Sequence, residues 1–158
     1  MTPAINCAKK AGIRFEVLEY HHDPASQSYG EEAAEKLGLS TAEVFKTLLV
    51  SLTGHRSTLA VAVLPVSHSL SLKAIAKALG AKKADMADPA LAERTTGYIL
   101  GGISPLGQKK ALPTVIDESA RSLTTVHVSA GRRGLEIALS PDDLSGLTRG
   151  IFAAITAQ

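Results

Sequence analysis

The chain has 158 residues, of which 45% are apolar and 20% charged, and its formal net charge at neutral pH is +2. This balance is that of a globular domain with a substantial core and excludes a disordered chain, and the small net charge means that any attraction to nucleic acid must come from local patches. Cys7 is the single cysteine, so an internal disulfide framework is excluded and a reducing compartment is expected.

The N-terminal part of the chain predicts a helix, a strand and a second helix. Thr2-Pro3 is an N-cap and first-turn pair, and Gly12 ends the helix that follows. Apolar and polar residues then alternate over 15–20, as in a strand, and an amphipathic stretch over 31–37 predicts the second helix. We see no signal-peptide pattern and no apolar run of the roughly 18 residues that span a membrane. We therefore expect a soluble cytoplasmic protein with no membrane partner.

A buried strand is predicted to begin near residue 45 and to run to about 52. Strand side chains alternate between two faces, so Lys46 shares a face with the apolar Val44, Leu48 and Val50. A lysine in such a place costs free energy unless its ammonium meets a partner or a wet pocket. The more common alternative is a long stem that carries the ammonium out to solvent. The pattern alone leaves both interpretations open.

The rest of the chain mixes strands and helices. Residues 59–66 are apolar on both faces, as expected of a central strand that is covered on both sides. Capping residues, glycine stops and β-favouring runs delimit the other elements. Helices are expected over about 72–79, 89–96 and from 141, and strands at 114–116, 124–128 and 135–139. Because strands and helices do not alternate strictly, the pattern indicates an α+β domain over residues 1–158.

Residues 96–110 form a glycine-rich loop. Gly102 and Gly107 have the spacing of a phosphate-binding P-loop, but Gln108 stands where the lysine belongs and no Ser or Thr follows it. This argues against a nucleotide triphosphatase. The glycines could still let backbone N–H groups approach a ligand and hold a carbonyl oxygen or an oxyanion. An ordinary turn-rich connection is the equally common alternative.

The sequence indicates neither a metal centre nor a protein nucleophile. His21-His22-Asp23 form one small cluster, but His55, His68 and His127 are scattered, and no two ligands have the helical spacing of a metal site. No serine lies in a G-x-S-x-G elbow, and Cys7 falls in the first predicted helix, where packing is its expected role. If the chain is an enzyme, it is expected to work without a metal, a cofactor or a covalent protein nucleophile.

Charged residues near predicted turns offer two further hypotheses. The basic pairs Lys82-Lys83, Lys109-Lys110 and Arg132-Arg133 would hold a nucleic-acid backbone if they converge in space, and are solvated turns if they do not. Glu136 faces away from the apolar residues on either side of it, which makes it either a solvent-facing carboxylate or an acid at the rim of a pocket.

Several blocks of sequence occur in a familiar order and spacing. They are MTPA at 1–4, FKTLLV at 45–50, AKK at 81–83 with MAD at 86–88, TGY at 96–98, GGISPLGQKK at 101–110, VS at 128–129 and GL at 134–135. Together they resemble the YbaK family over essentially the whole chain. This family comprises free-standing relatives of the editing insertion domain of bacterial prolyl-tRNA synthetase, and its YbaK members deacylate Cys-tRNA(Pro) and Cys-tRNA(Cys).

The resemblance implies a fold, an activity and a set of site residues. The fold is a mixed, partly closed and barrel-like β-sheet flanked by helices. The activity is deacylation of misacylated tRNA, with prolyl-tRNA synthetase as a partner and with no DNA partner and no cofactor. The family's key lysine, tyrosine and strand carboxylate fall on Lys46, Tyr20 and Glu136. Positions expected to line the pocket fall on Tyr29, Thr47, Gly101, Gly102, Ser104 and Ser129.

The chain departs from the family at three of its positions. Glu136 replaces an aspartate, Tyr29 stands where phenylalanine is common, and Ala130 stands where glycine is common. Because the first two belong to the expected pocket, these departures bear on the amino-acid preference.

The mechanism of the family needs no protein nucleophile, which agrees with the finding that the sequence indicates none. In YbaK members the thiol of the substrate cysteine attacks its own ester, so that the protein supplies positioning and electrostatics. Lys46 is then expected to orient the aminoacyl ester, the Gly101-Gly102 N–H groups to stabilise the oxyanion, and Tyr20 and Glu136 to hold the substrate amine. Two alternatives remain: a deacylase of another misacylated tRNA, such as Ala-tRNA(Pro), that uses water, and a non-catalytic module that binds tRNA or a synthetase.

Overall fold

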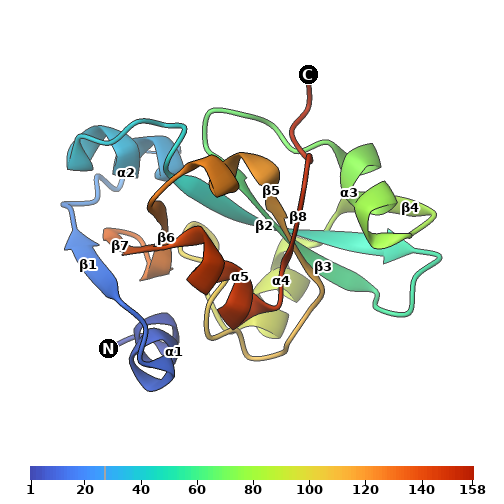
Figure 1. Cartoon of the computed structure of the whole chain (residues 1–158), viewed down its shortest axis with the longest axis horizontal. Helices are drawn as coiled ribbons and strands as arrows, with labels where there is room; N and C mark the ends of the chain where they lie inside the picture. The colour runs from blue at the N-terminus through green and yellow to red at the C-terminus, as the bar shows by residue number, and fades with distance from the viewer. Residues whose placement is uncertain (27) are drawn as a thin grey trace.

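The computed structural model describes residues 1–26 and 28–158 (Figure 1). Most helices begin where the sequence places a capping residue. The side chains of Thr2, Ser71, Asp88 and Ser140 each accept a hydrogen bond from the backbone N–H three residues further on. The helices are α1 (Pro3–Ala11), α2 (Tyr29–Leu37), α3 (Leu72–Leu79), α4 (Pro89–Thr96) and α5 (Pro141–Thr148), with a short 3-10 helix, η1 (Glu118–Ser122). Within the described residues, none of these helices has the length and apolar character to cross a membrane.

The strands form two sheets. They are β1 (Phe15–Glu19), β2 (Phe45–Thr53), β3 (Leu59–Pro65), β4 (Lys83–Met86), β5 (Thr114–Asp117), β6 (Val126–Arg132), β7 (Leu135–Leu139) and β8 (Ile151–Ala153). The smaller sheet, β1-β7-β6, is antiparallel throughout. The larger one, β4-β2-β3-β5-β8, is mixed, because β3, β5 and β8 run parallel. The predicted α+β fold is confirmed, with two open sheets in place of a single partly closed one.

A few boundaries differ from the sequence-based prediction. The edge strands β4 and β8 were not predicted, because four and three residues are too few for an alternating pattern to emerge. The strand expected at 124–128 begins at Val126 and continues through a bulge to Arg132, so the basic turn is shorter than expected. α2 begins at Tyr29, earlier than the predicted start at residue 31.

The predicted alternation along β2 is confirmed by the core. Phe45 and Leu49 pack in one apolar cluster, with residues of the smaller sheet, whereas Leu48 and Val50 pack in a second cluster with Ile75 of α3. Every residue of β3 is buried, as expected of a central strand that is covered on both sides. In Figure 1 the smaller sheet, α1 and α2 lie at one end of the molecule, and α3 and β4 lie at the other.

The two sheets meet at one point and then part. Val44, just before β2, forms a parallel bridge with His127 of β6. β4 pairs with β2 only from Val50 to Thr53. Among the described residues, the edge of β2 between the bridge and Val50 therefore has no neighbouring strand. This uncovered edge is where the candidate site lies.

Candidate active site

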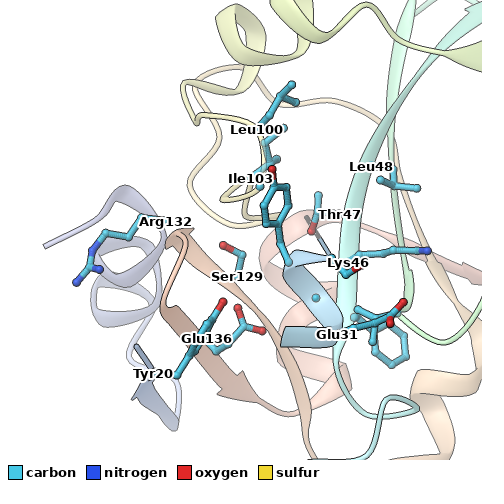
Figure 2. A pocket seen from close by; sticks show the side chains of 16 residues that line it. Tyr20, Glu31, Lys46, Thr47, Leu48, Leu100, Ile103, Ser129, Arg132 and Glu136 are labelled. Carbon is cyan, nitrogen blue, oxygen red and sulfur yellow. The ribbon is translucent and has the colours of Figure 1, made fainter. Parts of the chain in front are cut away.

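A cavity of about 430 Å³ opens where β2 and β6 part (Figure 2). β2, the start of α2, the loop after α4 and the smaller sheet all contribute to its wall. The lining residues are Tyr20, Ser28, Tyr29, Gly30, Glu31, Phe45, Lys46, Thr47, Leu48, Val66, Leu100, Gly101, Ile103, Ser129, Arg132 and Glu136. The volume is that of a pocket for a small organic group. Among the described residues, in this cavity or elsewhere, there is no group of three or more His, Cys, Asp or Glu side chains that could hold a metal ion.

Lys46 lies in this cavity and is half-buried. Burial lowers the pKa of its ammonium group, and the carboxylate of Glu31 opposes this shift. Lys46 takes part in none of the salt bridges found among the described residues. Figure 2 shows its amine pointing away from Tyr20 and Glu136, so the three groups occupy opposite sides of the cavity. Of the two interpretations of this lysine, the structure therefore supports the wet pocket.

Glu136 and Tyr20 form the wall opposite the amine of Lys46. Glu136, on β7, is 5% exposed and is paired with Leu18 of β1 and Ser129 of β6. Burial raises the pKa of its carboxyl group to about 8, so this group is mostly protonated at neutral pH. Burial also raises the pKa of Tyr20, and the nearby carboxyl of Glu136 adds to this shift. Glu136 is thus an acid in the wall of the cavity. At neutral pH this wall carries two neutral groups, the hydroxyl of Tyr20 and the mostly protonated carboxyl of Glu136.

Thr47 adds hydrogen-bonding groups on the uncovered edge of β2. Among the described residues, its Oγ1 is the one buried side-chain oxygen or nitrogen without a hydrogen-bond partner. The backbone bonds between Val44 and Val66, and between Leu52 and Thr58, show that even-numbered residues of β2 bond to the β3 side. The N–H and C=O of Thr47 therefore point to the edge that β4 leaves uncovered. A ligand there could use a donor, an acceptor and a hydroxyl together.

The glycine-rich loop contributes Gly101 but not its neighbours. Gly101 has a φ of +85°, and a Cβ at this position would come within 2.9 Å of the Tyr29 ring. Gly102 and Ser104, both predicted to line the pocket, lie outside its lining. The N–H of Gly102 donates to the carbonyl of Ile99 at 2.9 Å, which leaves it unable to serve an oxyanion. Ser104 is fully buried and is bonded within the loop. Both residues hold the loop that presents Gly101.

The three basic pairs do not converge at the cavity. Lys83 is paired with Thr53, seven strand positions and thus about 23 Å from Lys46, so Lys82-Lys83 lie toward the other end of β2. Lys109-Lys110 are exposed at the end of the glycine-rich loop and do not line the cavity. The remaining pair, Arg132-Arg133, follows the bulge of β6 beside the cavity. Among the candidate tRNA contacts, the structure places only these two arginines there.

The contacts that hold α2 against the smaller sheet were not predicted. Glu32 is buried, and its carboxylate accepts hydrogen bonds from the N–H of Asp23 at 2.9 Å and pairs with His22 at 2.7 Å and Lys36 at 3.4 Å. Burial alone would raise the pKa of Glu32, but these hydrogen bonds lower it below its ordinary value. The spacing of Glu32 and Lys36 was a usable local signal. The pairing with the segment after β1 depends on the tertiary fold, and it fixes Tyr29 beside the cavity.

Residues 22–147 match the model of the aminoacyl-tRNA editing domain, and this range includes every lining residue except Tyr20. The chain belongs to the aminoacyl-tRNA editing domain family. The resemblance to YbaK-type proteins is therefore confirmed, and the lining described above is that of an editing domain. The roles predicted for its individual residues stay predictions.

Two curated relatives of this editing domain cover most of its length. EbsC of Enterococcus faecalis, described as a candidate Cys-tRNA(Pro)/Cys-tRNA(Cys) deacylase, is 44% identical over 128 residues, which are 81% of this chain and 77% of EbsC. YwhH of Bacillus subtilis, an uncharacterized protein, is 30% identical over 115 residues, 73% of this chain and 71% of YwhH.

Solved structures share the fold of this editing domain. The crystal structure of a candidate trans-editing enzyme for prolyl-tRNA synthetase superimposes with a TM-score of 0.83 at 21% identity, covering 100% of this chain and 99% of that one. The hypothetical protein APE2540 gives a TM-score of 0.85 at 23% identity, covering 99% of this chain and 100% of that one. At these identities the likeness shows the fold alone, and it agrees with the single α+β domain described above.

Proposed function

We propose that this chain is a cytoplasmic trans-editing deacylase that removes cysteine from Cys-tRNA(Pro) and Cys-tRNA(Cys). The description of EbsC, at 44% identity, supports this substrate class. The observation that carries the chemistry is the cavity lining, which among the described residues contains two cationic side chains, hydroxyls and carboxyls but no cysteine and no histidine. Such a lining can bind and orient an aminoacyl ester.

A protein nucleophile does not fit this lining. A serine nucleophile needs an adjacent base to take its proton. Ser129 is paired with Glu136, but in this proposal the Glu136 carboxyl binds the substrate's α-ammonium group and is therefore not free to be that base. This observation supports a reaction in which the substrate supplies its own nucleophile.

The thiol of the bound cysteine fits that role. Its sulfur attacks the ester carbonyl carbon, the bond from that carbon to the ribose oxygen breaks, and the thiol proton ends on the ribose oxygen. The products of this step are free tRNA and a four-membered cyclic thioester, which one water molecule then opens to cysteine. Holding the thiol and the ester in a reactive arrangement is a positioning task that the cavity can perform.

The lining offers a partner to each end of the aminoacyl ester. In this proposal the Lys46 ammonium binds the terminal ribose or its phosphate, and the N–H of Gly101 stabilises the oxyanion. Tyr20 and Glu136 bind the α-ammonium group, whose positive charge favours the ionised form of Glu136. The Thr47 hydroxyl and the uncovered backbone of β2 accept or donate the remaining hydrogen bonds.

We also propose that prolyl-tRNA synthetase brings the tRNA to this protein. The net charge is only +2, and of the three basic pairs only Arg132-Arg133 lies beside the cavity. An RNA-binding surface of this kind releases few counterions, so its intrinsic affinity for tRNA is expected to be low at physiological salt. A complex with the synthetase would supply the missing affinity and the choice of tRNA.

Single-turnover deacylation of cysteinyl-, seryl-, alanyl- and prolyl-tRNA(Pro), with and without the synthetase, tests the proposal. Cysteinyl-tRNA should be cleaved far faster than seryl-tRNA, because a hydroxyl is a much weaker nucleophile than a thiol at neutral pH. Lys46→Ala should abolish most of this activity, while Lys82→Ala, a matched lysine away from the cavity, should not. Equal rates for cysteine and serine would contradict attack by the substrate thiol. Preference for alanine would indicate a water-dependent deacylase, and binding without release would indicate a non-catalytic module.

A further inference from the structure

Arg133 has a different environment from its neighbour Arg132. Its guanidinium carbon lies 3.7 Å from the centre of the Tyr29 ring, within stacking distance. Its Nη2 also donates to the carbonyl of Leu100 at 3.4 Å. Tyr29 and Leu100 both line the cavity. One side chain thus joins the β6–β7 turn, the first residue of α2 and the glycine-rich loop.

The half-buried Arg133 side chain packs closely against Gly101 and Tyr29. A Cβ on Gly101 would come within 2.4 Å of Arg133 Nε and 2.9 Å of the Tyr29 ring. The planar guanidinium therefore fills the space between an aromatic ring and a glycine bend. A lysine could not do this, because its ammonium is a compact point charge that neither stacks on a ring nor forms a fork of donors.

The start of α2 needs such an external contact. Ser28, the N-cap residue of α2, makes no side-chain capping hydrogen bond, in contrast to the cap residues of α1, α3, α4 and α5. His22 touches the Tyr29 ring edge-on, with ring centres 6.3 Å apart. Arg133 stacks on the same ring. The position of Tyr29 in the cavity wall thus depends on contacts with other segments.

We propose that Arg133 is a positioning residue that clamps Tyr29 against the Leu100-Gly101 bend and thereby sets the width of the cavity beside Gly101, where the aminoacyl carbonyl is proposed to bind. The exposed Arg132 then contacts the tRNA backbone. This inference rests on the proposed deacylase function for its substrate, but the clamp itself is a property of the free protein. Arg133 was predicted from the sequence to contact RNA; in this proposal it determines amino-acid selectivity instead.

Selectivity and salt dependence distinguish these two roles. Arg133→Ala should lower the preference for Cys-tRNA(Pro) over Ala-tRNA(Pro) by about tenfold, which is the order expected for a lost stacking contact. It should leave the slope of log(kcat/KM) against log[salt] unchanged. Arg132→Ala should do the opposite, reducing that slope by roughly 0.7 to 0.9 with the selectivity unchanged.

Conservative and paired variants make the test specific to the clamp. Arg133→Lys should behave like Arg133→Ala although the charge is kept, because the lysine ammonium cannot replace the planar guanidinium. Tyr29→Leu should lose selectivity, and combining it with Arg133→Ala should add little, as expected of two residues that act through one contact. A reduced salt slope with intact selectivity for Arg133→Ala, or full rescue by lysine, would overturn the proposal.

Amide hydrogen exchange in the free protein tests the clamp without tRNA. Arg133→Ala and Arg133→Lys should speed the exchange of residues 98–104 and of the first turn of α2, while the exchange of β3 stays slow. Unchanged exchange in these segments would overturn the clamp. If the wild type releases neither amino acid but the exchange result holds, the proposed deacylase function fails and the clamp stands.

Discussion

Replacing Glu136 by glutamine should stabilise the protein, and the gain should grow with pH. Burial raises the pKa of this carboxyl from an ordinary 4.5 to about 8 in the folded protein. Below pH 4.5 the carboxyl is protonated in both the folded and the unfolded chain, so folding carries no penalty from its titration. As the pH rises towards 8, the unfolded chain ionises while the folded one must keep its proton, and stability is lost. Glutamine has nearly the same shape and does not titrate.

The two pKa values set the size of the effect. At 1.36 kcal/mol for each pKa unit, the buried carboxyl destabilises the folded state by at most about 5 kcal/mol above pH 8 and by about 3 kcal/mol at pH 7. Between pH 5 and pH 8 the penalty grows by about 3 kcal/mol. The difference in unfolding free energy between Glu136→Gln and the wild type should grow by the same amount. This growth does not depend on how well the amide itself packs.

Urea unfolding at several pH values from 5 to 8, followed by circular dichroism, measures this difference. Glu19→Gln is a matched control, because Glu19 is an exposed residue of the neighbouring strand β1 and stays in water. Its effect on the unfolding free energy should show no comparable growth. If the gain from Glu136→Gln is the same at pH 5 and pH 8, the carboxyl is not held neutral by burial and the reasoning is refuted.

Substitutions at three further positions test the cavity wall and the contacts that support it. Thr47→Val removes a buried hydroxyl that lacks a protein partner, so the unfolding free energy should stay level or rise by about 1 kcal/mol. Single-turnover deacylation by this variant should fall about tenfold. Thr47→Ser should keep both the unfolding free energy and the deacylation rate of the wild type. Gly101→Ala should lower the melting temperature and the activity, because its φ is +85° and the new Cβ would collide with Arg133. Glu32→Gln should lower the unfolding free energy by roughly 1 to 3 kcal/mol at neutral pH. Because the folded-state pKa of Glu32 is lowered, this loss should shrink as urea titrations are taken to acid pH, through and below the ordinary value of 4.5.

Local chemistry made much of the fold predictable from the sequence. Thr2, Ser71, Asp88 and Ser140 each cap a helix that the sequence predicted, because a capping side chain acts on backbone groups within three residues. Alternation along β2 likewise predicted which side chains share a face, and Phe45 and Leu49 pack in a different core cluster from Leu48 and Val50. The edge strands β4 and β8 were not predicted, because their pairing depends on neighbours that are distant in sequence.

The candidate site was harder to predict, because its properties arise where segments meet. Alternation showed that Glu136 faces away from the apolar side of β7, but the burial that raises its pKa comes from the surrounding fold. The hydrogen bond between Gly102 and Ile99 and the burial of Ser104 depend on the conformation of the loop. The spacing of glycines in the sequence does not predict this conformation. Arg133 was grouped with Arg132 as a basic pair, and its contacts with Tyr29 and Leu100, which depend on the tertiary fold, separate their environments.

The pKa shifts of the cavity suggest how it releases its product in the proposed reaction. Burial lowers the pKa of Lys46 and raises that of Glu136, so both groups are pushed towards their neutral forms in the empty site. An aminoacyl-tRNA end brings an ammonium group and, several bonds away, a phosphate, so each of these charges favours the charged form of the group that it meets. Figure 2 places the amine of Lys46 and the carboxyl of Glu136 on opposite sides of the cavity. Free cysteine carries its ammonium and carboxylate on one carbon atom and cannot satisfy both sides at once, which favours its departure after the ester is cleaved.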